Sequence, residues 1–254
     1  MDSQNGTKIV FKPFLRFIID FHNRVDLYGR ILKQEIDANP VLQIGEVGLI
    51  YEAFIIKISA EWELFQLNIL AYCVAMDTSR ISKHLELSLP KKISFDNAFA
   101  VLNGLDFISI TSVADLKNIS KKILEEDSNP FKQFENGFLN RIDEVYALRN
   151  YISHKSKRSK IRLEKMYRDK HQINEFIFPG NFLVATKTNE NMKTSNFGEY
   201  VGTFLCIAVE AWKFLDIGSY EFVYKDDKSK EGMFLGMAKM REVFKQLTIE
   251  NGLS

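Results

Sequence analysis

The chain has 254 residues, 46% of them hydrophobic, so it can bury a substantial core as one large domain or two small ones. Its 34 basic and 33 acidic residues give a net charge of +1, which excludes a nucleic-acid-binding protein that is basic throughout. The only two cysteines, Cys73 and Cys206, exclude a disulfide-rich secreted scaffold. No Cys/His cluster has the spacing of a zinc site, and we expect neither a metal nor a cofactor.

Charged residues interrupt every long apolar segment. Near the N-terminus, FKPFLRFIIDFHNR is broken by Lys12, Pro13, Arg16 and Asp20, so no signal peptide is expected. The most apolar stretch, residues 48–76, carries three glutamates and a lysine at intervals, which argues against a membrane span. We therefore expect a cytoplasmic protein that does not enter a membrane.

Helical periodicity dominates the first half of the chain. Between Glu46 and Met76 apolar residues recur at steps of three and four, which predicts a long helix. A shorter helix is predicted to begin after Ser94, a good N-cap, and to end at Gly104.

The next helix start is the tetrapeptide SNPF. Asn129 suits an N-cap and Pro130 suits the first helical position, and an apolar stripe continues from there to Ile152. The segment 171–196 contains a strand-like piece, EFIFPGNFLVAT, and is expected to be an insertion. Two further helices are predicted, at about 197–215 and about 232–247. The fold class is therefore mainly α, a helical bundle with C-terminal additions.

The stretch EVYALRNYISHKSKR holds the candidate site. On a helical wheel Asn150 and His154 share a face that points away from the apolar stripe, with Tyr146 one turn earlier. Arg149 falls at the edge of the stripe. A histidine can take and give a proton near neutral pH, an arginine binds phosphate, and an asparagine can orient either. These types suffice for RNA cleavage by the RNA's own 2′-hydroxyl, with the arginine stabilising the phosphorane.

A single helix supplies only one histidine, whereas acid and base require two groups. A symmetric homodimer would provide both by pairing two such helices across a twofold axis. The basic residues that follow the histidine could hold flanking phosphates of the RNA. They are Lys155, Lys157, Arg158, Lys160 and Arg162. The alternative for this run is a solvated helix end, where cations suit the helix dipole.

The hexapeptide RNYISH resembles the R-N-x-x-x-H form of the Rx4-6H signature of the HEPN superfamily. EWELF (residues 61–65), ISFDNAFAVLNGLDFISI and NPFKQF are similar to upstream parts of stand-alone HEPN proteins of toxin and defence systems. The resemblance covers about 46–157. It implies a dimerising HEPN-like helical bundle as the core of a single domain, 1–254, with a C-terminal helical extension (about 160–254) and a small strand-like insertion.

The resemblance also implies an activity and partners. It implies a metal-independent endoribonuclease with Arg149, Asn150 and His154 as catalytic residues, acting as a toxin or antiphage effector with a cognate antitoxin or defence partner. The resemblance leaves open whether Glu61 or Glu63 contributes, and Tyr146 is a further auxiliary candidate. Many members paired with nucleotidyltransferase antitoxins carry a tyrosine two residues after the histidine, where this chain has Ser156.

Two other interpretations stay open. Many HEPN proteins are non-catalytic modules that bind a protein or nucleotide partner. Arg149 and His154 can also be ordinary surface residues of an amphipathic helix. The aromatic residues fall mostly on apolar stripes, so no base-stacking platform is expected among them.

Overall fold

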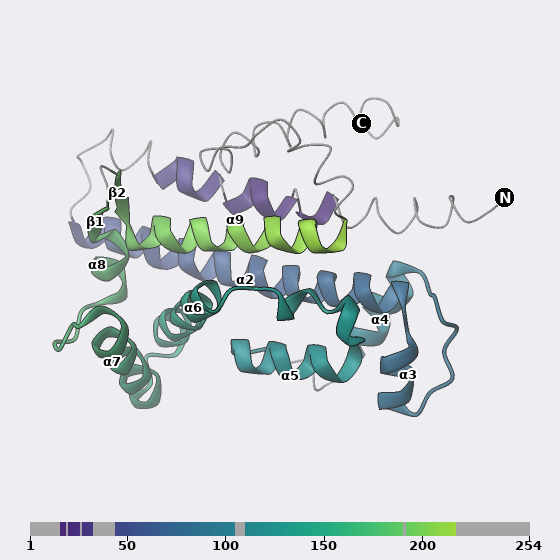
Figure 1. Cartoon of the computed structure of the whole chain (residues 1–254). Helices are drawn as coiled ribbons and strands as arrows, with labels where there is room; N and C mark the ends of the chain where they lie inside the picture. The colour runs from purple at the N-terminus through teal and green to yellow at the C-terminus, as the bar shows by residue number, and fades with distance from the viewer. Residues whose placement is uncertain are drawn as a thin grey trace, which may run out of the picture.

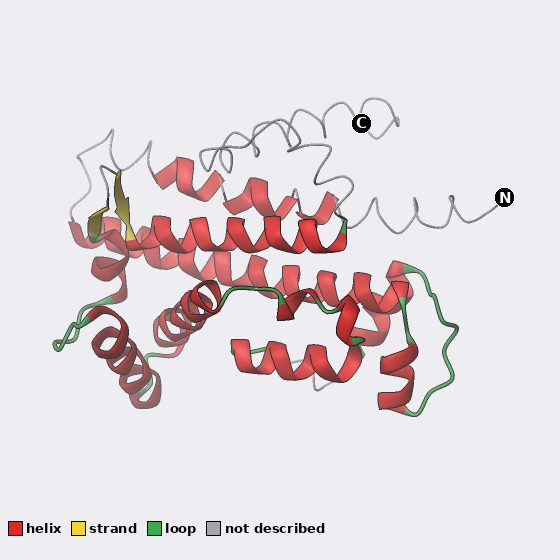
Figure 2. Ribbon diagram, in the orientation of Figure 1, coloured by secondary structure: helices red, strands yellow, loops and turns green. Residues whose placement is uncertain are grey.

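The computed structural model describes residues 16–18, 20–25, 27–32, 44–104, 110–189 and 192–216. It is mainly helical, as predicted, with one short antiparallel hairpin (Figures 1 and 2). In chain order the elements are α2 (Ile44–Met76), α3 (Ser79–Leu85), α4 (Phe95–Asn103), α5 (Val113–Ile123), the 3-10 helices η1 (Glu126–Ser128) and η2 (Pro130–Lys132), α6 (Asn136–His154), α7 (Lys157–His171), α8 (Pro179–Val184), β1 (Thr186–Asn189), β2 (Met192–Ser195) and α9 (Asn196–Leu215).

The core is built around α2. Trp62 of α2 contacts Phe204 of α9 with ring centroids 5.4 Å apart, and Phe65 stacks on Phe21 of the N-terminal helical residues at 4.7 Å. All four rings are at least 98% buried. Truncating a buried ring of this size typically costs about 3–5 kcal/mol, so this cluster contributes much of the stability. Figure 1 shows α9 running alongside α2.

The helices α6 and α7 form a hairpin with a sharp break. Lys155 ends α6 in the left-handed conformation (φ 46°), and the Ser156 hydroxyl accepts a hydrogen bond from the Ser159 N–H to cap α7. Helix α6 contacts α7, α5, α2 and α9, so several neighbours fix its position (Figure 1).

Two predictions about local structure were wrong. The expected helix from Pro130 is a 3-10 turn, capped as predicted by Asn129, and the α-helix begins only at Asn136. Within the strand-like piece, Pro179 starts the short helix α8, and the strands follow it. The helices predicted at 46–76, 95–104 and 197–215 are confirmed. The one expected at 232–247 lies outside the described residues.

Helix α8 is part of the core, because it packs closely on α2. A Cβ atom added at Gly180 would lie 2.5 Å from the backbone oxygen of Gly48, so only glycine permits this approach. The Gly180 N–H donates to Glu52 Oε1 at 2.9 Å and is thereby satisfied. Helices α7, α8 and α9 contribute buried residues to the same core as α2 and α6, whereas the division into a HEPN-like core and an extension from about 160 stays a prediction.

None of the described helices combines enough length with enough apolar character to cross a membrane. Helix α2 has the length, but its charged residues interrupt the apolar run.

Candidate functional site

Arg149 and Asn150 lie together on α6, beside a glutamate of α2. Arg149 Nη1 donates to Asn150 Oδ1 at 3.1 Å, and Nη2 lies 3.6 Å from Glu63 Oε1. The side chains of Arg149 and Glu63 are 32% and 39% exposed. Such a solvent-exposed ion pair contributes less than about 1 kcal/mol to stability, so it orients the guanidinium more than it holds the fold.

These three residues line an open cavity of about 570 Å³ between α2, α4 and α6. Its lining combines polar groups, including Thr111, with apolar side chains of α2 and α4 such as Leu64 and Leu102. A cavity with a few converging polar groups on an apolar floor is the usual form of a ligand site. With the described residues, Arg149 makes only the two contacts above, so its other N–H donors are available for a phosphate.

The structure distinguishes between the two candidate glutamates. Glu63 faces Arg149, whereas Glu61 accepts two hydrogen bonds from Arg24 at 2.9 and 3.0 Å on another face of α2. Trp62, between them, is buried as the helical wheel predicts. Only Glu63 is therefore placed to act beside Arg149.

Tyr146 also lines the cavity, although its side chain is only 2% exposed. Its hydroxyl accepts a hydrogen bond from Gln66 Nε2 at 3.0 Å. Burial raises the pKa of Tyr146 to about 12. The phenol therefore stays protonated at neutral pH, and it can donate a hydrogen bond to a bound oxygen but cannot serve as a base.

His154 is the last residue of α6, exposed and outside the cavity lining. It makes no hydrogen bond or ion pair with the described residues. The spacing places it one turn beyond Asn150 on the same face. The structure thus brings Arg149, Asn150, Tyr146 and Glu63 together and leaves the imidazole exposed outside the cavity lining, open to a substrate or a second chain.

The basic run does not continue α6. Lys155 caps the end of α6, whereas Lys157 and Arg158 begin α7. The dipole therefore suits a cation at Lys155, at the end of α6, whereas Lys157 and Arg158 lie at the start of α7, where cations add to the positive end of the helix. All three side chains are exposed.

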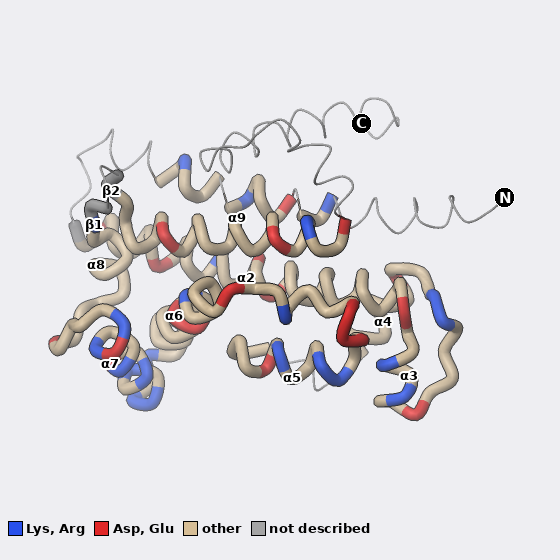
Figure 3. Tube along the Cα trace, in the orientation of Figure 1, with Lys and Arg blue, Asp and Glu red and all other residues tan. Residues whose placement is uncertain are grey.

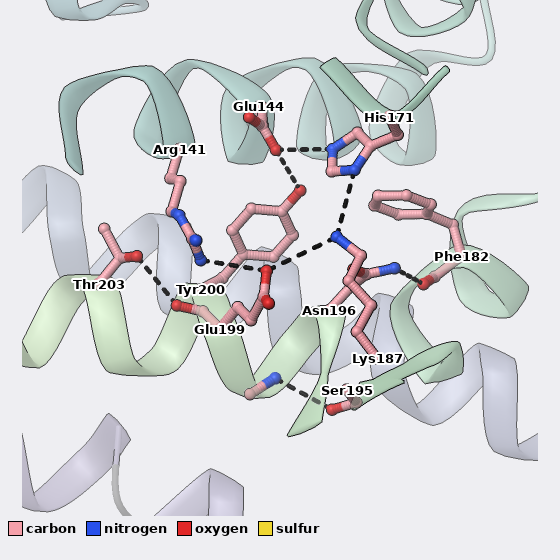
Figure 4. Close-up of polar contacts among 11 residues, drawn as sticks. Arg141, Glu144, His171, Phe182, Lys187, Ser195, Asn196, Glu199, Tyr200 and Thr203 are labelled. Atoms are coloured by element: carbon pink, nitrogen blue, oxygen red, sulfur yellow. Dashed lines mark hydrogen bonds and ion pairs between the residues drawn. The ribbon is translucent and has the colours of Figure 1, made fainter. Parts of the chain in front are cut away.

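A polar network that the sequence did not reveal links α6 to α7, β1 and α9 (Figure 4). Glu144 of α6 is 8% exposed, accepts a hydrogen bond from the Tyr200 hydroxyl at 2.8 Å and pairs with His171 Nε2 at 2.9 Å. Lys187 of β1 lies 3.5 Å from His171 Nδ1. Since an ammonium is only a donor, Nδ1 accepts there and Nε2–H donates to Glu144.

Two opposing effects act on the Glu144 carboxyl. Burial by itself would raise its pKa, but the hydrogen bonds from His171 and Tyr200 outweigh burial, and the net pKa is lowered. Glu199 extends the network to Arg141 at 3.1 Å and to Lys187 at 3.8 Å (Figure 4). These contacts join α6, α7, β1 and α9. His171 is mostly buried within this network.

Among the residues that the structure describes, no three His, Cys, Asp or Glu side chains lie close enough together to hold a metal ion. Comparison of the chain with protein-family models, with curated proteins and with solved structures found no match in any of the three. The HEPN resemblance therefore depends on the motifs quoted for it.

Proposed function

We propose that the protein is a metal-independent endoribonuclease of the HEPN type, whose site is completed by a second copy of the chain. The observation that carries the proposal is the placement of Arg149 and Asn150 at an open cavity with His154 exposed one turn further on. Glu63 and Asn150 orient the guanidinium from two sides, which supports the role of a pre-positioned phosphate ligand.

The chemistry follows from these groups. The RNA 2′-oxygen attacks the adjacent phosphorus, the bond to the 5′-oxygen breaks, and the products are a 2′,3′-cyclic phosphate and a 5′-hydroxyl. One imidazole takes the proton of the 2′-hydroxyl and a second gives a proton to the leaving oxygen. Arg149 stabilises the charge on the phosphorane. The exposed position of His154 at the end of α6 suits a twofold arrangement in which each chain supplies one imidazole.

The direct test compares purified wild type, His154→Ala and Arg149→Ala on total RNA in EDTA, with analysis of fragment ends. His84, exposed on α3, gives the matched control His84→Ala. We expect cyclic-phosphate ends from wild type and the control only, and at least a hundredfold loss in the other two variants. Equal cleavage by wild type and His154→Ala would overturn the proposal.

The dimer has a test of its own. Spin labels on Ser153→Cys, an exposed position beside the imidazole, report the distance between the two copies in solution once the native cysteines are replaced. Helices packed against each other lie about 8–10 Å apart, so labels within roughly 20 Å support a shared site. Labels much farther apart, or a monomer, would contradict it.

The role as a toxin or antiphage effector is part of the same proposal and depends on the resemblance alone. It predicts that induced expression of wild type arrests growth and that His154→Ala does not. A second candidate function, a non-catalytic binding module, is favoured by the apolar part of the cavity, where Leu64 is 41% exposed. That function predicts no cleavage by wild type and loss of partner binding in Leu64→Ala.

A further inference from the structure

Three aromatic rings gather where α6, α7 and the chain before α8 meet. Tyr151 of α6 packs edge-on against Phe176 with centroids 5.4 Å apart, and Phe176 packs edge-on against Phe178 at 5.4 Å. Lys160 of α7 places its ammonium 4.6 Å from the centre of the Phe176 ring. We call Tyr151, Phe176 and Phe178 the aromatic cluster.

The aromatic cluster runs from the edge of the core, against which Tyr151 and Phe176 pack, out to the solvent. Phe178 is 64% exposed, and Tyr151 and Phe176 are only partly buried. A single exposed ring is common on protein surfaces, but Phe178 differs because it continues a row of three contacting rings. The aromatic residues were expected to fall mostly on apolar stripes, and Phe178 is an exposed exception.

Helix α7, beside the aromatic cluster, is strongly positive although the whole chain is nearly neutral, and the acidic groups near the rings are Glu175 and Glu164, which lies 3.7 Å from Lys160. Helix α7 carries seven Lys or Arg residues against two Asp or Glu, and Figure 3 shows the blue positions crowding this helix. Lys157, Arg158 and Lys160 in its first two turns are exposed. A polyanion is the ligand that this charge attracts, which disfavours a neutral or basic protein surface.

The aromatic cluster also adjoins the proposed catalytic face. Tyr151 lies three residues before His154 on α6, so the two side chains are surface neighbours. On the helical wheel the order around α6 is Arg149, Asn150, His154 and Tyr151. A strand crossing the site from the cavity would therefore pass the imidazole and reach the rings.

We propose that the aromatic cluster and the first turns of α7 form a binding platform for single-stranded RNA, with an unpaired base stacked on Phe178 and flanking phosphates held by Lys157 and Lys160. Bases in a duplex are stacked internally and cannot use an exposed ring, so the platform selects unpaired strands. The inference deepens the proposed function by naming its substrate class, single-stranded RNA. It rests on the proposed function only in treating the bound strand as a substrate.

The test uses a strand that cannot be cleaved, a 2′-O-methyl oligoribonucleotide of about ten residues that carries 2-aminopurine, whose fluorescence is quenched by stacking. We expect binding to wild type with quenching. Phe178→Ala should bind about tenfold more weakly and lose the quenching, whereas Phe178→Trp should retain both. Leu87→Ala removes another exposed apolar side chain, 52% exposed in the loop after α3, and should change neither.

The electrostatic contribution to RNA binding is tested by varying the salt concentration. Lys157→Gln should lower the slope of log affinity against log salt concentration by about 0.7, the value for one phosphate contact on a single strand. A duplex of the same sequence should bind more weakly than the strand, and Phe178→Ala should not weaken it further. Thermal melting of each variant verifies that an altered affinity does not come from unfolding.

Several results would overturn the platform. They are the absence of binding by wild type, an unchanged affinity in Phe178→Ala, and equal affinity for strand and duplex. Loss of self-association without loss of RNA binding in Phe178→Ala would also overturn it, because the surface would then be a protein contact. The uncleavable strand separates the two proposals. If wild type binds the uncleavable strand but does not cleave ordinary RNA, the platform is supported and the nuclease is refuted. If wild type cleaves ordinary RNA but Phe178→Ala binds with unchanged affinity, the nuclease is supported and the platform is refuted.

Discussion

Tyr200→Phe tests the buried network behind α6, because it removes one hydroxyl and changes no volume elsewhere. The Tyr200 hydroxyl donates at 2.8 Å to Glu144, whose carboxylate is 8% exposed and keeps its other partner, His171, in the variant. A hydrogen bond to a charged group contributes about 1.5–3 kcal/mol. We expect the free energy of unfolding to fall by about 2 kcal/mol.

Tyr167 provides the matched control. It is also fully buried, but its hydroxyl has no hydrogen-bond partner among the described residues. An unpaired buried hydroxyl is unfavourable, so Tyr167→Phe should be neutral or stabilising by up to about 1 kcal/mol. In urea unfolding with an m-value of about 3 kcal/mol per M, Tyr200→Phe should lower the midpoint by roughly 0.7 M and Tyr167→Phe should not lower it.

The stabilisation that Glu144 contributes depends on pH. The pKa of Glu144 is lowered in the folded state, so the network stabilises the fold above the unfolded pKa of about 4.3 and loses this contribution as the pH falls through the lower folded value. The difference between wild type and Tyr200→Phe should stay constant from pH 7 to 5 and shrink only below about 4. Equal losses in both tyrosine variants at pH 7, or no loss in Tyr200→Phe, would refute the reasoning.

Three further predictions concern other parts of the molecule. Gly180→Ala should lower the free energy of unfolding by about 1–3 kcal/mol because the new methyl group meets the α2 backbone, whereas Gly202→Ala, with open space on α9, should raise it by up to about 1 kcal/mol; thermal melting measures both. Glu63→Gln should tighten binding of an uncleavable RNA severalfold by removing a negative charge from the cavity, and Glu61→Gln should not; fluorescence anisotropy measures this. Burial raises the pKa of the Cys73 thiol to about 12, so peptide mapping should find it alkylated at pH 8 only after denaturation.

Local signals were sufficient for the long helices. The three-and-four spacing across 46–76 and the cap at Ser94 correspond to α2 and α4 as predicted. They failed where a segment is short: α8 has six residues, too few for helical periodicity, and it lies within EFIFPGNFLVAT, which was expected to be strand-like. This segment packs closely on Gly48 of α2, a contact more than 120 residues away in the chain that local signals do not contain.

The candidate site was predictable only within one helix. Helical spacing put Arg149 beside Asn150 and placed His154 one turn on, and α6 has these positions. The choice between Glu61 and Glu63 depends on how α2 is rotated relative to α6. A helical wheel of one helix alone does not give this rotation. Glu144 gave a weak signal, a carboxylate three and four residues before buried positions, but its partners lie on α7 and α9.

Helix α6 joins these features mechanically. Its inner side is tied through Glu144 to α7 and α9, and its outer side carries Arg149, His154 and Tyr151. The proposed phosphate ligand Arg149 and the proposed catalytic His154 keep their spacing because they lie on one rigid helix, whereas the same groups on separate loops would not. Since α7 continues from the end of this helix and carries the positive charge, anchoring α6 to α7 through His171 also fixes the charged surface relative to the cavity. The buried network therefore stabilises the geometry on which both the proposed cleavage and the proposed strand binding depend.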